Sequence, residues 1–372
     1  MPIKSIHDRF REVYPASPEP RIFRAPGRVN LIGEHTDYNQ GLVLPMAIDL
    51  DCLVATAPSP DGMLRVYSEN LSQGTQWPIG DFATLMPQGD WSDRVAGIAW
   101  ALARRGVEIE PQNMLIASDV PLGGGLSSSA ALGVSVALAL GAGPDGLARL
   151  AHTAETDFVG VPCGIMDQFV SVHGQAGAAI LLDCRSLHWR AIPLPPDLAI
   201  VAVNSMIKHE LGASAYRTRV AECAEAARIL KIPSLRDASL KDLAVLTGTL
   251  ARRACHVVTE NLRVEAFAAA AARGDLETMG RLAVESHKSL RDDYEVSCTE
   301  LDFLVDSALA LPGVLGARMT GGGFGGSTVN FVRPDTVENF TRALTVDYEK
   351  HWGKTPQIHI CTPSAGAGRI FV

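Results

Sequence analysis

The sequence predicts an α+β protein built from two domains, and three features of the chain support this fold class. Its 372 residues suffice for two or three domains of ordinary size. Strand patterns interrupted by glycine-rich loops dominate before residue 205, whereas Ala-rich helical patterns dominate after it. No repeat of fixed period and no low-complexity segment is visible. We therefore expect one domain over residues 1–204 and a second over residues 205–372.

The elements expected in the first domain follow from residue patterning. A short amphipathic helix precedes Pro15, and two apolar strands within residues 22–48 flank a dense polar loop. Further strands are expected over residues 53–57, 63–67, 113–118, 178–183 and 198–204. Helices are expected over residues 95–105, 127–140 and 146–159, and a loop rich in Gly, Pro and Trp over residues 74–91.

The second domain is expected to be mostly helical between residues 216 and 290. Strands over residues 314–319 and 328–332 then flank a glycine cluster, and a helix over residues 337–351 follows.

Charge and cysteine content narrow the class of protein. The net charge of −8 and the pI of about 5.7 disfavour nucleic acid or an anionic membrane as partner. The seven cysteines form no CxxC pair, which disfavours a disulfide framework or a zinc ribbon and favours reduced thiols in a cytoplasmic protein. No apolar signal-peptide core is visible near Met1, and the longest nearly apolar run, residues 130–143, is too short to span a bilayer.

A glycine-serine stretch over residues 121–131 lies between an expected strand and an expected buried helix. Its three glycines allow close backbone approach to a ligand, and the three serines that follow start the helix. Their hydroxyls and the free N–H groups of the first turn are expected to point at one spot, which the helix dipole makes favourable for an anion. A glycine turn with a serine N-cap is the alternative, although one cap needs only one serine. We interpret the stretch as a phosphate site.

Other nucleotide-binding signatures fail. Gly353-Lys354-Thr355 resembles the end of a Walker A motif, but Tyr348 stands where its first glycine belongs. The spacing of Gly123 and Gly125 does not give the dinucleotide fingerprint, and no protein-kinase motif set is present.

A polar loop near the N-terminus is the second unusual segment. Glu34, His35, Thr36 and Asp37 follow one another between two apolar stretches. Two carboxylates and an imidazole so close together suit the hydroxyl groups of a sugar, although an exposed hairpin loop has similar composition. Arg28, inside apolar sequence just upstream, is expected to be partly buried and paired.

These two segments, together with the third glycine cluster over residues 319–327, resemble the three motifs of the GHMP kinase family. Residues 27–39 resemble the signature of the galactokinases within it, and residues 161–168, 256–261 and 286–298 extend the resemblance over most of the chain. The resemblance implies a two-domain GHMP kinase fold with the active site in the cleft between the domains. The N-terminal mixed-sheet domain would resemble the second domain of ribosomal protein S5. The C-terminal domain would be ferredoxin-like, and the last strand is allowed to return to the first domain.

The resemblance also implies an activity, the transfer of the γ-phosphate of ATP to the C1 hydroxyl of α-D-galactose. It implies that Asp167 is the catalytic base and that Arg28 keeps it ionised. The sugar-binding residues that it implies are Glu34, His35, Thr36, Asp37, Gly164 and Tyr216. As a lone residue, Asp167 would be read as a helix-start carboxylate.

The implied nucleotide site uses the glycine-serine stretch and one strand residue. Its members are Ser68, Gly123, Gly124, Gly125, Leu126, Ser127, Ser128 and Ser129. Ser129 and Glu155 are implied ligands of Mg²⁺, which kinases need to neutralise the phosphate oxygens. Without the resemblance, Glu155 reads as a solvated surface charge. Galactose and MgATP are the expected partners, and the chain is expected to be a monomer or a weak homodimer.

Two other functions stay open from the sequence. One is a GHMP kinase for another substrate such as N-acetylgalactosamine or arabinose, whereas a mevalonate-type alcohol would make little use of the polar loop. The other is a non-catalytic sensor of galactose and ATP on the same fold.

Overall fold

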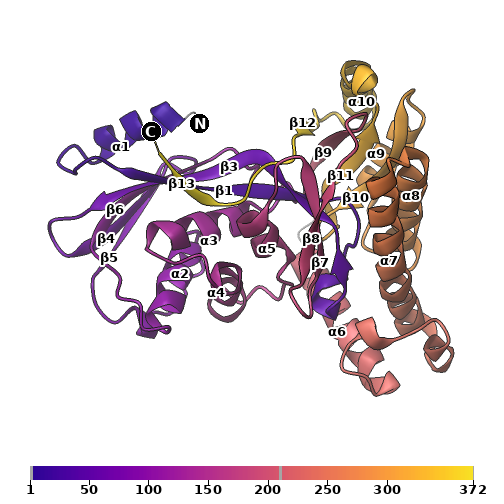
Figure 1. Cartoon of the computed structure of the whole chain (residues 1–372), viewed down its shortest axis with the longest axis horizontal. Helices are drawn as coiled ribbons and strands as arrows, with labels where there is room; N and C mark the ends of the chain where they lie inside the picture. The colour runs from indigo at the N-terminus through magenta and orange to yellow at the C-terminus, as the bar shows by residue number, and fades with distance from the viewer. Residues whose placement is uncertain (1–2, 209–211, 372) are drawn as a thin grey trace.

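The computed structural model describes residues 3–208 and 212–371. Figure 1 shows an elongated molecule with a sheet-rich body at one end and a helix-rich body at the other. Strands β1 (Arg21–Asn30) and β3 (Pro45–Pro58) run from the first body toward the second. The two chain ends lie close together beside the first body (Figure 1).

The first body is built on a six-stranded mixed sheet. The strand order is β13-β1-β3-β6-β4-β5, and only the β4–β6 pair is parallel among the pairs described. The remaining strands are β4 (Met63–Ser68), β5 (Gln73–Pro78), β6 (Gln112–Ser118) and β13 (Gly368–Ile370). A sheet of this length with one parallel pair requires a crossover, which the helical segment between β5 and β6 supplies.

Helices cover both faces of this sheet. Helix α1 (Ile3–Val13) packs Ile6 and Phe10 against one face. The other face carries α2 (Asp93–Ala103), α3 (Ser128–Ala139), α4 (Leu147–Thr153) and α5 (Met166–His173). Helix α3 is almost wholly apolar because it lies between the sheet and its neighbouring helices, and this burial explains why it shows no polar face.

A small sheet joins the two bodies. It consists of β2 (Leu42–Val43), β7 (Ala178–Asp183) and β8 (Trp189–Pro193) in the order β2-β7-β8. Strand β2 ends the polar loop, so that pairing with β7 fixes one side of this loop.

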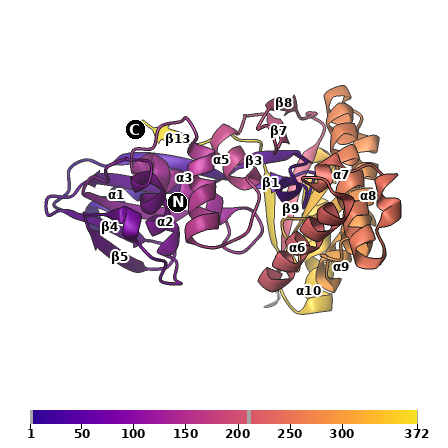
Figure 2. The same ribbon diagram turned by 90° about the horizontal axis from the view of Figure 1, so that it is seen from below.

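The second body is a four-stranded antiparallel sheet backed by helices. Its strands are β9 (Ala199–Lys208), β10 (Val314–Thr320), β11 (Gly325–Val332) and β12 (Gln357–Cys361), in the order β10-β11-β9-β12. Its helices are α6 (Gly212–Leu230), α7 (Gly248–Arg273), α8 (Leu276–Asp292), α9 (Thr299–Leu309) and α10 (Val337–Trp352). Figure 2 shows α6 to α8 gathered at this end of the molecule.

The last strand returns to the first body. Strand β13 pairs antiparallel with β1, and Ile370 lies opposite Ile22. Strand β9 already belongs to the second sheet from Ala199 onward. Together, the strand arrangement and the helices confirm the α+β fold class, whereas the boundary at residue 205 stays a prediction.

Most predicted elements are present, and the errors fall on edge strands. The predicted loop over residues 74–91 is wrong in part because β5 occupies its start, and β8 and β12 were not predicted. β5 is an edge strand that exposes most of its side chains and therefore shows no clear apolar alternation. β12 does alternate polar and apolar residues, so its pattern was present in the sequence and was missed. The predicted helix over residues 146–159 is α4 followed by a π-helical turn, Ala154–Phe158.

None of the described helices is both long and apolar enough to cross a membrane.

Candidate active site

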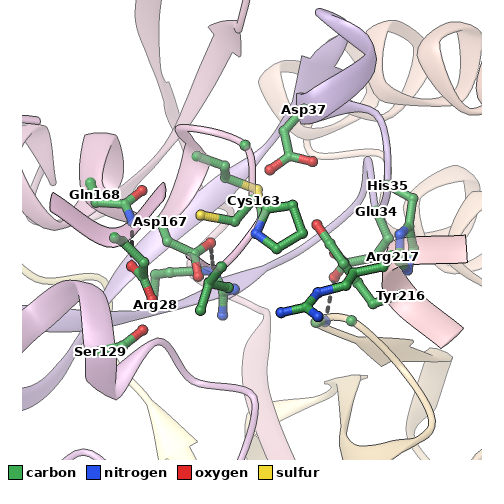
Figure 3. Close-up of a pocket in the computed structure, with 17 residues that line it drawn as sticks. Arg28, Glu34, His35, Asp37, Ser129, Cys163, Asp167, Gln168, Tyr216 and Arg217 are labelled. Carbon is green, nitrogen blue, oxygen red and sulfur yellow. Dashed lines mark hydrogen bonds and ion pairs between the residues drawn. The ribbon is translucent and has the colours of Figure 1, made fainter. Parts of the chain in front are cut away.

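A cavity of about 290 Å³ lies where the two bodies meet, a volume near the lower end of the range for small-molecule sites. Side chains from the polar loop, α3, the π-helical turn, α5 and α6 line it, and Gly321 and Gly322 form another part of its wall. Figure 3 shows Arg28, Asp167 and Ser129 on one side and Glu34, His35 and Tyr216 on the other. The cavity therefore brings together residues from all three glycine-rich or polar motifs.

Arg28 and Asp167 form a two-pronged ion pair on the first side. Arg28 Nε and Nη2 each lie 2.7 Å from a different carboxylate oxygen of Asp167. Arg28 is only 5% exposed, as predicted, and its Nη1 donates to the Gly125 carbonyl at 2.6 Å. Ser127 Oγ also donates to Asp167. This geometry holds the carboxylate still and keeps a positive charge beside it.

Strand β1 positions Arg28 against the glycine-serine loop. A register shift between Pro26 and Arg28 interrupts the pairing of β1 with β3. The Arg28 N–H donates to the Leu126 carbonyl at 3.1 Å, and a Cβ on Gly27 would lie 2.7 Å from the same oxygen. Close contact between strand and loop therefore requires glycine at this position.

The glycine-serine loop adopts left-handed backbone at three positions before α3 begins. Gly123 and Gly125 both have φ of +74°, and Ser127 has φ of +62°. The Ser127 hydroxyl turns toward Asp167, whereas Ser129 lines the cavity. The three serine hydroxyls therefore do not share one direction, unlike the arrangement expected from the sequence. Ser68, at the end of β4, is buried and does not line this cavity.

Glu155 is engaged by two neighbours rather than solvated. Arg94 Nη1 lies 2.8 Å from its Oε1, and Gln168 Nε2 donates to its Oε2 at 2.7 Å. Ser129 and Glu155 line the same cavity, and they present only oxygen atoms, the donors that Mg²⁺ prefers. These two residues therefore fit a magnesium ion, with Arg94 as the competing cation.

The polar loop presents Glu34 from a buried position. Its Oε1 accepts from the Thr320 hydroxyl at 2.9 Å and from the Gly321 N–H at 2.8 Å. The third glycine cluster thus fixes the orientation of this carboxylate. Thr36 differs from its neighbours, since its hydroxyl lies within hydrogen-bonding distance of the Gly33 and Leu42 carbonyls and does not line the cavity.

Asp37 and Gly164 face each other across the cavity wall. A Cβ on Gly164 would collide with the Asp37 carboxylate, so glycine is needed for this approach. Burial and the charge of nearby Asp167 raise the pKa of Asp37 to about 7. This carboxyl group is therefore partly protonated at neutral pH.

His35 and Tyr216 form the neutral part of the site. Their ring centroids lie 5.5 Å apart, with Tyr216 contributed by α6. Burial and nearby His256 lower the pKa of His35 to about 3, and burial raises the pKa of Tyr216 well above its usual value. Both rings are therefore uncharged and act through hydrogen bonds and packing.

Helix α7 holds the polar loop from behind, a role that the sequence did not predict. His256 Nε2 bonds the Glu34 carbonyl at 3.1 Å, Glu260 accepts from the Gly33 N–H at 2.9 Å, and Asn261 accepts from the Leu42 N–H at 2.7 Å. Their positions place three polar side chains on one face of an otherwise Ala-rich helix. That pattern was the available signal for a buried polar contact.

Several polar residues in or beside the cavity were also missing from the predicted site. Cys163, Gln168 and Arg217 line the cavity, and Arg94 contacts it through Glu155. Arg217 reaches across from α6 toward the Gly160 carbonyl at 3.5 Å.

Three family models match successive segments of the chain. Residues 8–58 match the galactokinase galactose-binding signature, residues 93–175 the GHMP kinase N-terminal domain and residues 267–350 the GHMP kinase C-terminal domain. A galactokinase of Chloroflexus aggregans is 47% identical, covering 99% of this chain and 98% of its own length. The human galactokinase is 44% identical, with 96% and 94% coverage.

Solved structures of related kinases share the fold of this chain. The Lactococcus lactis galactokinase complexed with galactose superposes with a TM-score of 0.93 at 34% identity, covering 99% of this chain and all of its own. A mevalonate kinase structure at 18% identity, with a TM-score of 0.65 and coverage of 92% and 98%, shares the fold. The identities, the coverage and the matched domains show that this chain belongs to the galactokinase family of the GHMP kinases.

Proposed function

We propose that this protein transfers the γ-phosphate of ATP to the C1 hydroxyl of α-D-galactose, giving galactose 1-phosphate and ADP. The observation that carries the proposal is the Arg28–Asp167 ion pair in the same cavity as the loop from Glu34 to Asp37. A paired carboxylate suits proton transfer from an alcohol, and the loop suits recognition of several hydroxyls.

The sugar would lie between the polar loop and α6. Glu34 and Asp37 would accept hydrogen bonds from its hydroxyls, His35 and Tyr216 would contact its other polar atoms, and the Gly164 backbone would lie beside it. Thr36 would act indirectly, because its hydroxyl holds the loop backbone. Recognition thus depends on carboxylates whose positions the protein has already fixed.

Asp167 would receive the proton of the C1 hydroxyl as that oxygen bonds to the γ-phosphorus, and the bond to the bridging oxygen of ADP breaks. Arg28 remains protonated beside it and offsets negative charge on the transferring group. Ser127 would hold one Asp167 oxygen in place through its hydroxyl.

The nucleotide would bind along the glycine-serine stretch. Residues 123–129 lead into the first turn of α3, where the N–H groups of a helix have no partner within the helix, and Ser68 is the proposed contact outside this segment. Ser129 and Glu155 would hold Mg²⁺, which neutralises the phosphate oxygens when it is bound. Gln168 would keep Glu155 oriented through its present hydrogen bond.

The partners, the oligomeric state, the location and the domain boundary are also proposals. Galactose and MgATP are the expected partners, without nucleic acid or membrane, and a monomer or weak homodimer is expected. All seven cysteines are free, which agrees with a cytoplasmic location. We propose the division into residues 1–204 and 205–372, with β13 returning to the first domain.

The test is an ATP-coupled assay with a panel of sugars, using Asp167→Asn as the inactive control. Turnover that is highest with galactose and absent in the variant supports the proposal. Turnover with N-acetylgalactosamine or arabinose but not galactose would overturn the substrate. Binding of galactose and ATP without phosphoryl transfer would instead identify a sensor.

A further inference from the structure

His35 has an unusual backbone conformation and a buried ring nitrogen without a hydrogen-bond partner among the described residues. Its φ of +62° places a non-glycine residue in the left-handed region, where backbone strain is expected. The side chain is only 4% exposed, yet its buried Nε2 has no hydrogen-bond partner in the described part of the chain. Because buried polar atoms are normally paired, the free Nε2 in the cavity wall points to a ligand.

The other ring nitrogen begins a chain of hydrogen bonds that leads away from the cavity. His35 Nδ1 lies 2.9 Å from Tyr38 Oη, which lies 2.7 Å from Tyr294 Oη. Tyr294 Oη in turn lies 2.9 Å from Cys223 Sγ. Tyr294 and Cys223 are buried, and they come from the segment after α8 and from α6. His35 and Tyr38 share the polar loop, whereas Tyr294 and Cys223 come from two other segments of the fold.

The rings of His35, Tyr38 and Tyr294 pack against one another in addition to forming these hydrogen bonds. Tyr294 lies with its centroid 4.9 Å from that of His35 and 4.5 Å from that of His256. Tyr38 lies 5.8 Å from His35 in an edge-on arrangement. Phenylalanine at either tyrosine position would therefore keep the packing and remove only the hydroxyl.

The chain of bonds can run in two directions, and the donor strengths favour one. Burial keeps His35 neutral, so only one ring nitrogen carries a proton. If Tyr38 donates to Nδ1 and Tyr294 donates to Tyr38, both phenolic donors meet strong acceptors, and the thiol ends the chain as a weak donor. In the reverse direction, the Tyr294 hydroxyl would donate its hydrogen bond to the Cys223 sulfur, which is a weak acceptor. The first direction leaves the proton on Nε2.

The cavity side agrees with this direction. Glu34 and Asp37 accept hydrogen bonds when ionised, so a sugar hydroxyl that donates to either carboxylate retains lone pairs that need a donor. A proton on Nε2 of His35 would supply that donor (Figure 3 shows His35 beside Glu34).

We propose that Tyr38 and Tyr294, ending at Cys223, are positioning residues that hold His35 as its Nε2–H tautomer, so that it donates a hydrogen bond to the bound sugar. This inference rests on the proposed function, because it requires a hydroxylated ligand at His35.

The kinetic test replaces the hydroxyls one at a time. Tyr38→Phe and Tyr294→Phe should each raise the KM for galactose about tenfold, while the KM for MgATP stays unchanged. Cys223→Ser keeps a donor at the end of the chain and should behave as the unmodified protein does. The matched control is Tyr348→Phe, since Tyr348 also buries a hydroxyl, bonded to the Ser205 carbonyl at 2.8 Å, and neither residue lines the cavity. It should lower the melting temperature without changing either KM.

A second measurement tests the tautomer without catalysis. NMR of isotope-labelled histidine in the sugar-free protein distinguishes the two tautomers, and His35→Gln assigns the signal among the ten histidines. The Nε2–H form is expected in the unmodified protein and a mixture of forms in Tyr38→Phe. A proton on Nδ1, or Phe variants that lose only stability as the Tyr348 control does, would overturn the inference. Absence of galactose turnover in the unmodified protein would overturn the proposed function instead, and the tautomer result would still stand.

Discussion

The two sides of the cavity differ in how many of their ionisable groups are charged, although Glu34 on the sugar side also lies 3.6 Å from buried Arg318. On one side, the charges are close together and compensated, as Arg28 pairs with Asp167 and Arg94 with Glu155. On the other side, His35 is neutral and Asp37 is partly protonated, because burial opposes charge on both. The first arrangement suits the transfer of a charged phosphoryl group, and the second suits a neutral sugar.

The two sides also differ in what holds them. Ion pairs within the first body fix Asp167 directly, since Arg28 comes from β1 and Asp167 from α5. The polar loop is fixed from outside, by α7 of the second body through His256, Glu260 and Asn261. Changes on the first side should therefore affect chemistry, whereas changes behind the second side should affect stability and sugar binding.

The largest expected effect is on the charged side. Asp167→Ala should lower kcat by about 10²- to 10⁴-fold, the usual contribution of a positioned base. It also leaves Arg28 buried without its carboxylate, so we expect a loss of about 3 kcal/mol of unfolding free energy. Steady-state kinetics and thermal unfolding measure the two effects, and calorimetry should show near-normal ATP binding.

Asp167→Asn separates these two effects. The amide keeps the shape of the side chain and an acceptor for the Ser127 hydroxyl, but it cannot take up the proton. It should retain more stability than the alanine variant and be equally inactive. Retained turnover in this variant would assign Asp167 a role in charge stabilisation rather than proton transfer.

The second prediction concerns the contacts of His256, Glu260 and Asn261 in α7 with the backbone of the polar loop, which we call the clamp. Glu260 is fully buried, accepts from the Gly33 N–H and the Ser286 hydroxyl, and pairs with Arg263 at 2.7 Å. Breaking this pair with Glu260→Gln should cost about 3 kcal/mol of unfolding free energy and raise the KM for galactose. Denaturant unfolding and sugar-dependent kinetics measure both. A neutral variant with unchanged stability would show that the clamp does not depend on charge.

The same pair predicts a pH dependence. Burial alone would raise the pKa of Glu260, but Arg263, His256 and Arg318 lower it to about 2. Its contribution to stability is therefore present above the ordinary carboxyl pKa of 4.5 and lost as pH falls toward 2. The matched control is Glu225→Gln, which breaks an exposed pair with Arg228 at the same spacing and should leave the unfolding midpoint unchanged.

Strand and helix patterns predicted most of the fold because burial determined them. Apolar runs marked α3 and β9, which lie inside the molecule, whereas the exposed edge strand β5 left too weak a pattern. The π-helical turn of Glu155 could not be predicted, since helix propensity does not report a change in hydrogen-bond spacing.

For the site, motif composition predicted Arg28 in a buried pair, and the resemblance supplied Asp167 as a partner 139 positions away. The direction of the Ser127 hydroxyl and the clamp by Glu260 depend on backbone angles and on contacts between distant segments. The polar face of α7 signalled a buried polar contact, but the partner of that contact and the direction of the Ser127 hydroxyl have no local sequence signal.

A smaller effect tests the proposed metal ligand. Glu155→Gln should raise the Mg²⁺ concentration needed for half-maximal ADP binding about tenfold, the change that a loss of 1.4 kcal/mol brings. Arg94→Met removes the competing cation and should shift the requirement in the opposite direction. Calorimetry at varied Mg²⁺ measures both, and equal requirements in the two variants would argue against Glu155 as a ligand.

The smallest expected effect is a pH dependence caused by Asp37, whose pKa responds to the charge of Asp167 on the other side of the cavity. Burial and the charge of Asp167 raise its pKa from 3.8 to about 7, with a smaller rise from Glu34 and an opposing effect of Arg28. Between these two values the folded protein holds a proton that the unfolded chain has lost, so this group makes stability fall as pH rises from about 4 to about 7. The carboxylate is the better acceptor for a sugar hydroxyl, so the KM for galactose should fall a few fold across pH 7.

Asp37→Asn should remove both pH dependences, since the amide does not titrate in this range. Its KM for galactose should be raised and flat with pH, while the KM for MgATP follows that of the unmodified protein. If the asparagine variant keeps the pH dependence, the titrating group lies on the charged side of the cavity, and the separation into a charged and a neutral side would be wrong at this point. If the dependence disappears, sugar affinity is set by a carboxyl group whose burial keeps it partly uncharged, and protonation there tunes binding without altering the chemistry at Asp167.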